Sequence, residues 1–293
     1  MDGVLILDKP AGMTSHDVVH RVRRILGERS VGHLGTLDPM ATGVLPLVLG
    51  RMTRLAQFYT GSEKTYEGEF LFGFATDTYD AAGDVMGPVR DPVLDLEQVR
   101  AAARHYQGSI QQMPPPFSAK KIAGVPAYRL ARQKKPVALQ PVTVEVKELE
   151  VESLEGGRAR FRARVAAGTY LRSVAHDLGQ DLGCGGHLAV LRRTSVGEFG
   201  ISEACTLEQV EGAAESGTAA ALLVHPRRLL PQFPAVTATE ECAALIRHGR
   251  AVNLPELSRA RQVKVFQGQG ELIAIATRVA GTLFHPRIVF SRE

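Results

Sequence analysis

Apolar positions near the start of the chain change from the spacing of a strand to that of a helix. Residues 3–7 form a short, nearly continuous apolar run, which predicts a buried strand. Residues 15–26 carry an apolar stripe at helical spacing, with basic side chains on the opposite face. Ser15 can cap this helix, and Gly27 is placed to end it. The chain therefore opens with a strand and an amphipathic helix.

The same two periods continue along the next two hundred or so residues, which is more than one small domain usually contains. The predicted strands cover residues 65–74, 142–152 and 158–166. The predicted helices cover residues 96–106 and 171–182. Residues 76–87 are polar and predict a turn region, whereas residues 32–50, with four glycines and two prolines, predict a tightly turned loop followed by a short helix or strand. Because strands and helices interleave, the predicted fold class is α/β, in the mixed α+β sense.

A change of composition divides the chain near His225–Pro231, a stretch that resembles a linker. After it, Thr237 and Glu240 can form a capping box for a helix that ends at Gly249. Short strands joined by glycine turns follow at 263–266, 272–277 and 282–290. We therefore predict two domains, residues 1–230 and a small β-rich module of residues 231–293.

Composition excludes several classes of protein. With 44% hydrophobic and 23% charged residues, the chain is neither disordered nor fibrous. Its apolar runs are shorter than the ~20 residues that cross a bilayer, and its start does not resemble a secretory signal, so a cytoplasmic location and no membrane are expected. Its three cysteines are far apart, which favours free, buried thiols over a zinc site or disulfides.

A net charge of +4 is compatible with a polyanionic partner, and its placement matters more than its size. Residues 111–141 contain a proline run and several basic residues, which predicts an exposed cationic loop. Arginines alternate with apolar residues from Arg158 to Arg164, which puts four guanidinium groups on one face of a strand. A solvated sheet face and an RNA-binding face both fit that pattern.

The segment from Gly32 to Pro46 is the strongest candidate for chemistry. Pro39 disfavours helical geometry at Asp38, and the glycines Gly35 and Gly43 allow close approach to the backbone. The Asp38 carboxylate can therefore be presented on a turn. Taken alone, an Asp-Pro pair is more often only a turn.

The whole segment resembles the catalytic loop of the TruB family of transfer RNA pseudouridine synthases. The resemblance covers roughly residues 1–230 and, more weakly, the tail, which is similar to a PUA-type RNA-binding module. The other matching motifs are Asp8-Lys9-Pro10, Lys64-Thr65-Tyr66, Gly73 to Gly83, Ser118-Ala119 with Tyr128, Gly168 to Ser173, and Gly185 to Gly197 with Leu191-Arg192-Arg193.

This resemblance implies an isomerase that flips uridine 55 out of the T-loop and converts it to pseudouridine without a cofactor or a metal. Asp38 would be the nucleophile, and Arg172 would pair with it, which lowers a carboxyl pKa and fixes its direction. The alternative for Arg172 is a surface charge near a helix start. Tyr66 would stack on the flipped base. It also matches the tyrosine proposed as a general base, although a phenol with a pKa near 10 is a poor base at neutral pH.

Five further residues acquire roles in substrate or RNA binding from the same resemblance. His33 would fill the space that the flipped base leaves; alternatively, it bonds a nearby carbonyl within a turn. Lys9 would support the active-site loop, Tyr170 would contact the Asp38 region, and Leu191 would pack on the uracil. Arg193, in the same motif as Leu191, is predicted to bind RNA. Lys9, Tyr170 and Leu191 can equally serve core or strand-end packing.

Two other functions remain as alternatives. One is a guide-RNA-dependent synthase acting on ribosomal RNA, a class with a longer N-terminal extension and a fuller tail than this sequence shows. The other is an RNA chaperone that folds the T-arm, an activity that can coexist with catalysis. The expected partner is therefore the T-arm of tRNA, with no guide RNA, and the expected state is a monomer. Asp77, Asp80 and Asp84 lack the spacing of a calcium loop and are predicted to stabilise a turn.

Overall fold

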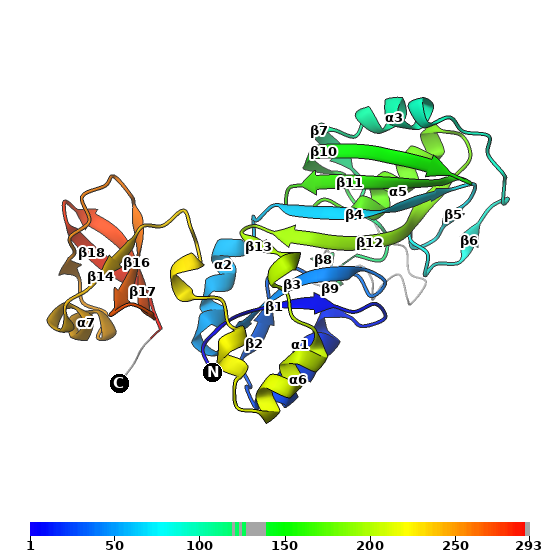
Figure 1. The fold of residues 1–293 in the computed structure, drawn as a ribbon. Helices are drawn as coiled ribbons and strands as arrows, with labels where there is room; N and C mark the ends of the chain where they lie inside the picture. The colour runs from blue at the N-terminus through cyan, green and yellow to red at the C-terminus, as the bar shows by residue number, and fades with distance from the viewer. Residues whose placement is uncertain (119–120, 123–124, 127–138, 291–293) are drawn as a thin grey trace.

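The computed structural model describes residues 1–118, 121–122, 125–126 and 139–290, and Figure 1 shows a large and a small β-sheet within it. The large sheet has nine strands, and its main path runs β1-β3-β12-β4-β11-β10-β7, with β2 paired to β3 and β13 to β12. These strands are β1 (Gly3–Lys9), β2 (Val31–His33), β3 (Thr42–Leu49), β4 (Lys64–Phe72), β7 (Gly108–Gln112), β10 (Val142–Glu155), β11 (Arg158–Val165), β12 (Gly186–Val196) and β13 (Phe199–Gly200).

Four helices contribute side chains to the same apolar core as the large sheet. They are α1 (Ser15–Leu26), α3 (Leu96–Arg104), α5 (Leu171–Asp181) and α6 (Leu207–Glu215). The shorter helices are η1 (Gly50–Leu55), α2 (Ala56–Tyr59), η2 (Ile201–Glu203), η3 (Ala219–Leu222) and η4 (Pro226–Arg228). The predicted mixed α/β class is confirmed. Within the described residues, no helix has the length and apolar character needed to cross a membrane.

Two small hairpins lie outside the large sheet. One pairs β5 (Ala75–Thr76) with β6 (Val85–Met86), and the other pairs β8 (Lys121–Ile122) with β9 (Val125–Pro126). The first is the predicted polar turn region, in which the Asp77 carboxylate accepts from the Asp84 amide at 2.9 Å and the Asp80 carboxylate accepts from the Thr78 hydroxyl at 2.7 Å. The predicted turn-stabilising role is confirmed for the carboxylates of Asp77 and Asp80, whereas Asp84 takes part through its backbone amide.

Strand β1 is apolar at nearly every position because both of its faces are buried. Leu5 and Leu7 belong to the core beneath the helices, whereas Val4 and Ile6 belong to a second core on the opposite face. Successive side chains of a strand point to opposite faces, so a continuous apolar run is the pattern of a strand covered on both sides. The second core also includes side chains of the C-terminal module, for example Phe266.

The small sheet, of five strands, runs β14-β16-β17-β18-β15 and carries helix α7 (Figure 1). Its elements are β14 (Ala235–Thr237), α7 (Glu240–Arg247), β15 (Val252–Asn253), β16 (Gln262–Gln267), β17 (Glu271–Ala280) and β18 (Leu283–Val289). The predicted β-rich tail is confirmed. The predicted cap is wrong: Thr239, not Thr237, accepts from the Cys242 amide, because Thr237 pairs with Phe266 in the sheet.

The stretch His225–Pro231 does not behave as an exposed linker, so that prediction is wrong. Leu229 and Leu230 are 1% and 0% exposed and lie in the core shared with the small sheet. The ammonium group of Lys264 donates to the Leu229 carbonyl at 2.6 Å. Buried leucines and a buried lysine fix this connection. The domain boundary at residue 230 stays a prediction.

The cap of the first helix lies one residue earlier than predicted, at Thr14, and the helix itself begins at Ser15. Thr14 accepts from the Asp17 amide while the Asp17 carboxylate accepts from the Thr14 amide, which completes a capping box. Gly27 ends the helix with φ 59°, as predicted. Ser15 is released from capping, and its hydroxyl instead bonds both backbone groups of Leu37, next to Asp38.

The arginines of β11 do share one face, and that face is mixed in charge. Arg158, Arg162 and Arg164 form ion pairs with glutamates of neighbouring strands and turns. Cross-strand pairs of opposite charge are a usual feature of a solvated sheet face. The structure therefore favours a solvated face over an RNA-binding one for these arginines.

Candidate active site

The loop between β2 and β3 presents Asp38, and glycine is required where the loop rejoins the sheet. Gly43 has φ 102°, and a Cβ atom there would lie 2.1 Å from the carbonyl oxygen of Arg193. Gly35 has φ 122°, also outside the range that other residues adopt readily. Close approach of β3 to β12 at Gly43 therefore depends on the missing side chain. The predicted turned loop and the strand after it are confirmed.

Three buried side chains hold this loop from below. Arg193 is 1% exposed and donates to the carbonyls of Val44, Thr36 and Gly35 at 2.8, 3.3 and 3.0 Å. Lys9 is fully buried, and its ammonium group donates to the Pro10, Met13 and Pro39 carbonyls at 2.8, 2.6 and 3.3 Å. Ser15 adds the bonds to Leu37.

Lys9 and Arg193 therefore have the same structural role, because both hold the backbone of the loop that carries Asp38. For Lys9, a bond to the residue after Asp38 agrees with the predicted support of the loop. Arg193 is committed to backbone carbonyls and almost fully buried, so the geometry gives no support to direct RNA contact by its guanidinium. Burial lowers the pKa of Lys9 to about 8, with Asp38 opposing the shift.

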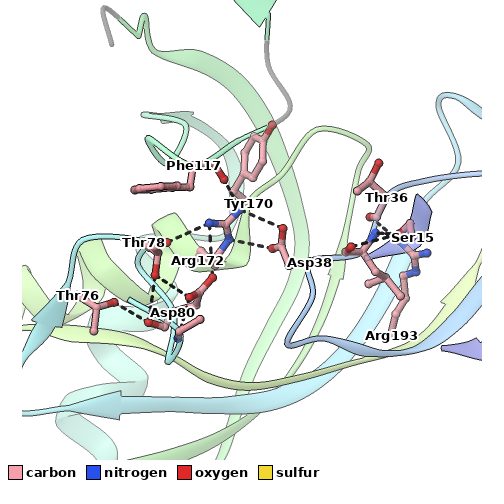
Figure 2. A network of polar contacts seen from close by, with 12 residues as sticks. Ser15, Thr36, Asp38, Thr76, Thr78, Asp80, Phe117, Tyr170, Arg172 and Arg193 are labelled. Atoms are coloured by element: carbon pink, nitrogen blue, oxygen red, sulfur yellow. Dashed lines mark hydrogen bonds and ion pairs between the residues drawn. The ribbon is translucent and has the colours of Figure 1, made fainter. Parts of the chain in front are cut away.

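Arg172 lies against Asp38, as Figure 2 shows. Its Nη2 donates to Oδ1 of Asp38 at 3.1 Å, and its Nε lies 2.9 Å from Oδ2 without being aligned for a hydrogen bond. The Arg172 side chain is 5% exposed and sits in the first turn of α5. The predicted pairing is confirmed, and the alternative of a surface charge is wrong.

Three further groups fix the same guanidinium. Nη1 donates to the Thr78 carbonyl at 3.0 Å and lies 3.6 Å from the Asp80 carboxylate, and Nη2 donates to the Phe117 carbonyl at 2.9 Å. Asp80 was predicted only as a turn residue, and its position as a second carboxylate beside Arg172 was missed. No local sequence signal joins Asp80 to Arg172, because their contact depends on how the hairpin packs against α5.

Opposing effects act on the pKa of the Asp38 carboxyl. Burial raises the pKa of the Asp38 carboxyl, Arg172 opposes that shift, and the charge of Asp80 adds to it. The predicted lowering by Arg172 is present, but burial outweighs it, so the pKa of Asp38 is raised overall. The Asp38 side chain is 34% exposed and lines a pocket. A nucleoside bound against Asp38 would reduce this exposure, and Arg172 would then be the main group that stabilises the carboxylate charge.

A cavity of about 280 Å³ opens in front of Asp38. Its lining combines the loop, strand β4, the segment before α5 and strand β12. The predicted site residues on its wall are Asp38, Tyr66, Tyr170, Arg172, Leu191 and Arg193. A concave site with apolar walls and a few convergent polar groups is the usual form of a small-molecule pocket, and here its size suits one nucleoside.

The aromatic and apolar walls come from three different elements. Tyr66 lies on β4, Tyr170 is the residue before α5, and Leu191 lies on β12 and is 7% exposed. The side-chain amide of Gln112 holds the backbone of Tyr170: its Oε1 accepts from the Tyr170 amide at 2.8 Å, and its Nε2 donates to the Tyr170 carbonyl at 3.0 Å. Burial raises the pKa of the Tyr170 phenol. A planar base between such walls would be stacked and shielded from water.

His33 lies at the end of β2, outside this lining. Its ring meets His16 edge-on at 5.8 Å, and its Nδ1 is buried with no hydrogen bond among the described residues. The alternative of a turn histidine that bonds a carbonyl through Nδ1 is therefore not observed. Burial lowers the pKa of His33 to about 4, with His16 and Arg193 adding to the shift, so the imidazole is neutral at physiological pH.

The other predictions concern metal ligands, cysteines and the cationic loop. Within the described ranges, no three His, Cys, Asp or Glu side chains are grouped to hold a metal ion, and Cys184 and Cys205 are buried free thiols while Cys242 is partly exposed. Ala119 and Tyr128 of one motif, and most basic residues of the predicted cationic loop, lie outside the described residues.

Known families and proteins are similar to this chain over most of its length. Residues 23–171 match the TruB family pseudouridylate synthase (N terminal domain), and residues 172–230 match the tRNA pseudouridylate synthase B C-terminal domain. The chain is 50% identical to tRNA pseudouridine synthase B of Solibacter usitatus over 99% of this chain and 100% of that protein. It is 39% identical to the protein of the same name from Geobacter sulfurreducens, over 96% of this chain and 95% of the relative.

Two solved structures with a similar fold come from multi-protein complexes. A chain of a Cbf5-Nop10-Gar1 complex is 27% identical, with a TM-score of 0.72 over 99% of this chain and 85% of that chain. A chain of the archaeal box H/ACA sRNP Nop10-Cbf5 complex is 26% identical, with a TM-score of 0.70 over 99% of this chain and 86% of that chain.

Proposed function

Because the chain belongs to the TruB family of pseudouridylate synthases, we propose that it converts uridine 55 in the T-loop of tRNA to pseudouridine. It is an isomerase. The relatives that are similar over nearly their whole length carry the name tRNA pseudouridine synthase B, which supports tRNA as the substrate. A substrate of this kind also supports a cytoplasmic location.

The observation that carries the proposal is the Asp38–Arg172 pair at the wall of a pocket of nucleoside size. The Asp38 carboxylate attacks the nucleoside, and the bond between ribose C1′ and uracil N1 breaks. The uracil turns, C1′ bonds to C5, and the bond to the Asp38 carboxylate breaks, which returns the free carboxylate. The hydrogen on C5 leaves to solvent and N1 gains a proton, so the product is an isomer. Arg172 fixes the direction of the carboxylate and stabilises its charge.

The target base is paired or stacked within folded tRNA, so it must be flipped out at a cost of a few kcal/mol. Tyr66 and Leu191 then hold the two sides of the uracil, and Tyr170 closes the wall next to Asp38. His33, neutral and beyond the pocket, fills the space that the base leaves. An uncharged ring suits this role because it can stack among bases without a counter-ion.

The C-terminal module contributes to RNA binding rather than to chemistry. It is β-rich, and the predicted PUA-like character is part of the proposal. Strands β14 to β18 form a separate sheet (Figure 1) and contribute no residue to the lining of the pocket, so we expect them to contact tRNA beyond the T-loop. We expect a monomer that recognises the T-arm directly and needs no guide RNA.

Asp38→Asn is the test of the proposed function. Asparagine keeps the volume of the side chain but removes its nucleophilic charge, so no pseudouridine should form in a single-turnover assay at saturating enzyme. Release of tritium from tRNA labelled at uracil C5 measures the reaction. Affinity for tRNA should stay within about 1 kcal/mol of wild type, the scale of one hydrogen bond.

The matched control is Asp84→Asn, which changes an exposed carboxylate outside the pocket lining and should leave the rate unchanged. Substantial tritium release by Asp38→Asn, without deamidation back to aspartate, would contradict the assignment of the nucleophile. Binding of tRNA with no tritium release by the wild-type protein would instead indicate an RNA chaperone.

A further inference from the structure

The turn from Thr76 to Asp80 has an unusual backbone conformation beside the active site. Tyr79 has φ 64°, in the left-handed region that bulky side chains rarely adopt. The residues on either side of it supply partners of Arg172, namely the Thr78 carbonyl and the Asp80 carboxylate (Figure 2). Such a conformation persists only where the surrounding structure imposes it. The contacts of Tyr79 therefore indicate what holds the turn in place.

The ring of Tyr79 stacks on the ring of His176. Their centroids are 3.8 Å apart and the planes differ by 12°. His176 lies on α5 four residues after Arg172, so both side chains project from the same face of the helix. Burial lowers the pKa of His176, which keeps its ring neutral at physiological pH. One face of α5 therefore holds the turn at two successive points.

Strand β12 holds the backbone of the same turn. The Leu188 amide donates to the Tyr79 carbonyl at 3.0 Å, and the Ala81 amide donates to the Leu188 carbonyl at 3.0 Å. Within the turn, the Thr76 hydroxyl donates to the Asp80 carbonyl at 2.7 Å. Because β12 fixes the backbone of the turn, the stacked Tyr79 ring determines how the turn packs against α5.

We propose that Tyr79 and His176 are positioning residues for the isomerisation. Their stacked rings hold Thr78 and Asp80 against Arg172, and Arg172 in turn orients the Asp38 carboxylate. Neither ring belongs to the lining of the pocket. The inference rests on the proposed function, because it assigns these residues to the same reaction.

The test compares Tyr79→Asn with Tyr79→Phe. Asparagine tolerates the left-handed backbone but lacks the ring, whereas phenylalanine keeps the ring. We expect Tyr79→Asn to lower the single-turnover rate constant at least about tenfold, because a misplaced catalytic group costs rate more than binding. Its dissociation constant for tRNA should change by less than about twofold, and Tyr79→Phe should behave as wild type. His176→Leu, which removes the other ring, should repeat the effect of Tyr79→Asn.

A double-mutant cycle with Arg172→Lys separates positioning from a general effect on folding. If the stack acts through Arg172, Tyr79→Asn should cause little further loss in the Arg172→Lys background. Equal losses in both backgrounds would overturn the proposal. So would a lower melting temperature with an unchanged rate constant in both Tyr79→Asn and His176→Leu. Tritium release by the wild-type enzyme, measured in the same series, tests the proposed function separately.

Discussion

At the scale of single residues, the active site depends on one guanidinium shared by two carboxylates. Arg172 faces Asp38 on one side and Asp80 on the other, and backbone carbonyls complete its surroundings. Two carboxylates around one cation leave a net negative charge, so Asp80 raises the pKa of Asp38 in addition to the larger effect of burial. The planar fork of arginine is suited to holding several acceptors in fixed directions.

Arg172→Lys should therefore lower the single-turnover rate strongly although the charge is kept. An ammonium group cannot meet Asp38, Thr78 and Asp80 in the directions that the guanidinium does. The measurement is tritium release at saturating enzyme, with the tRNA dissociation constant measured beside it. A near-normal rate constant would show that orientation of Asp38 by the guanidinium is not needed.

The pH dependence of the same rate follows from the sign of the Asp38 shift. The reactive form is the carboxylate, and burial raises the pKa of Asp38, so the rate should fall as pH drops through that raised pKa. Asp80→Asn removes a negative charge next to Arg172 and should move this acidic limb to lower pH. A limb that moves to higher pH, or that stays in place, would contradict the electrostatic coupling between the two carboxylates.

At the scale of elements, the catalytic loop is fixed where β3 crosses close to β12. Gly43 pairs with Arg193 in the parallel contact between these strands, and the Arg193 side chain turns back to bond the loop. The same residue thus supplies the backbone that excludes a Cβ atom at Gly43 and the guanidinium that holds Gly35. Arg193 therefore links the close packing of the two strands to the orientation of the loop.

Gly43→Ala should destabilise the protein by about 2 to 6 kcal/mol, from backbone strain and from overpacking against Arg193. Gly27→Ala is the matched control, since Gly27 also has a positive φ but meets nothing within 4 Å. It should cost only about 1 to 2 kcal/mol, the cost of the left-handed backbone. Chemical denaturation measures both. Equal losses would show that contact with Arg193 adds nothing.

At the scale of the whole molecule, the C-terminal module is joined to the catalytic sheet by an apolar core rather than by a free linker. Phe266, Leu272 and Phe290 pack in one cluster with Val4 and Ile6 of β1. Arg51 and Arg54 of η1, which follows β3, donate to the backbone carbonyls of Phe290 and Val289 at the end of β18. The position of the module relative to the pocket is therefore defined, as recognition of an RNA larger than one nucleoside requires.

Removing charge from this module should weaken tRNA binding without changing chemistry. Arg259 and Arg287 are exposed on the module, and Arg259→Gln with Arg287→Gln removes two cations without disturbing the core. If both arginines bind phosphate, the slope of log affinity against log salt should fall by about 2, because each phosphate that is no longer neutralised lowers it by about one. The single-turnover rate at saturating enzyme should stay near wild type. An unchanged salt slope would exclude these arginines from the interface.

Local patterns and motifs were sufficient for the elements and for much of the candidate site. Helical and strand periods located α1, α5 and the main strands. The resemblance around Gly32 to Pro46 led to Asp38, and the resemblance from Gly168 to Ser173 led to its partner Arg172. Errors at this level were local. Both misplaced helix caps, Ser15 for Thr14 and Thr237 for Thr239, arose because neighbouring hydroxyl residues compete for the same position, and the choice between them depends on where the backbone turns.

Periodicity and the order of motifs along the chain were enough to predict the mixed α/β class, the β-rich tail and the identity of the central pair. The folded structure was needed to show that Asp80 shares Arg172, that Arg193 is buried beneath the loop, and that Leu230 lies in a core rather than a linker. It also decided the sign of the Asp38 pKa shift. Each of these depends on burial and on contacts between residues far apart in the chain, and neither quantity exists until the chain has folded.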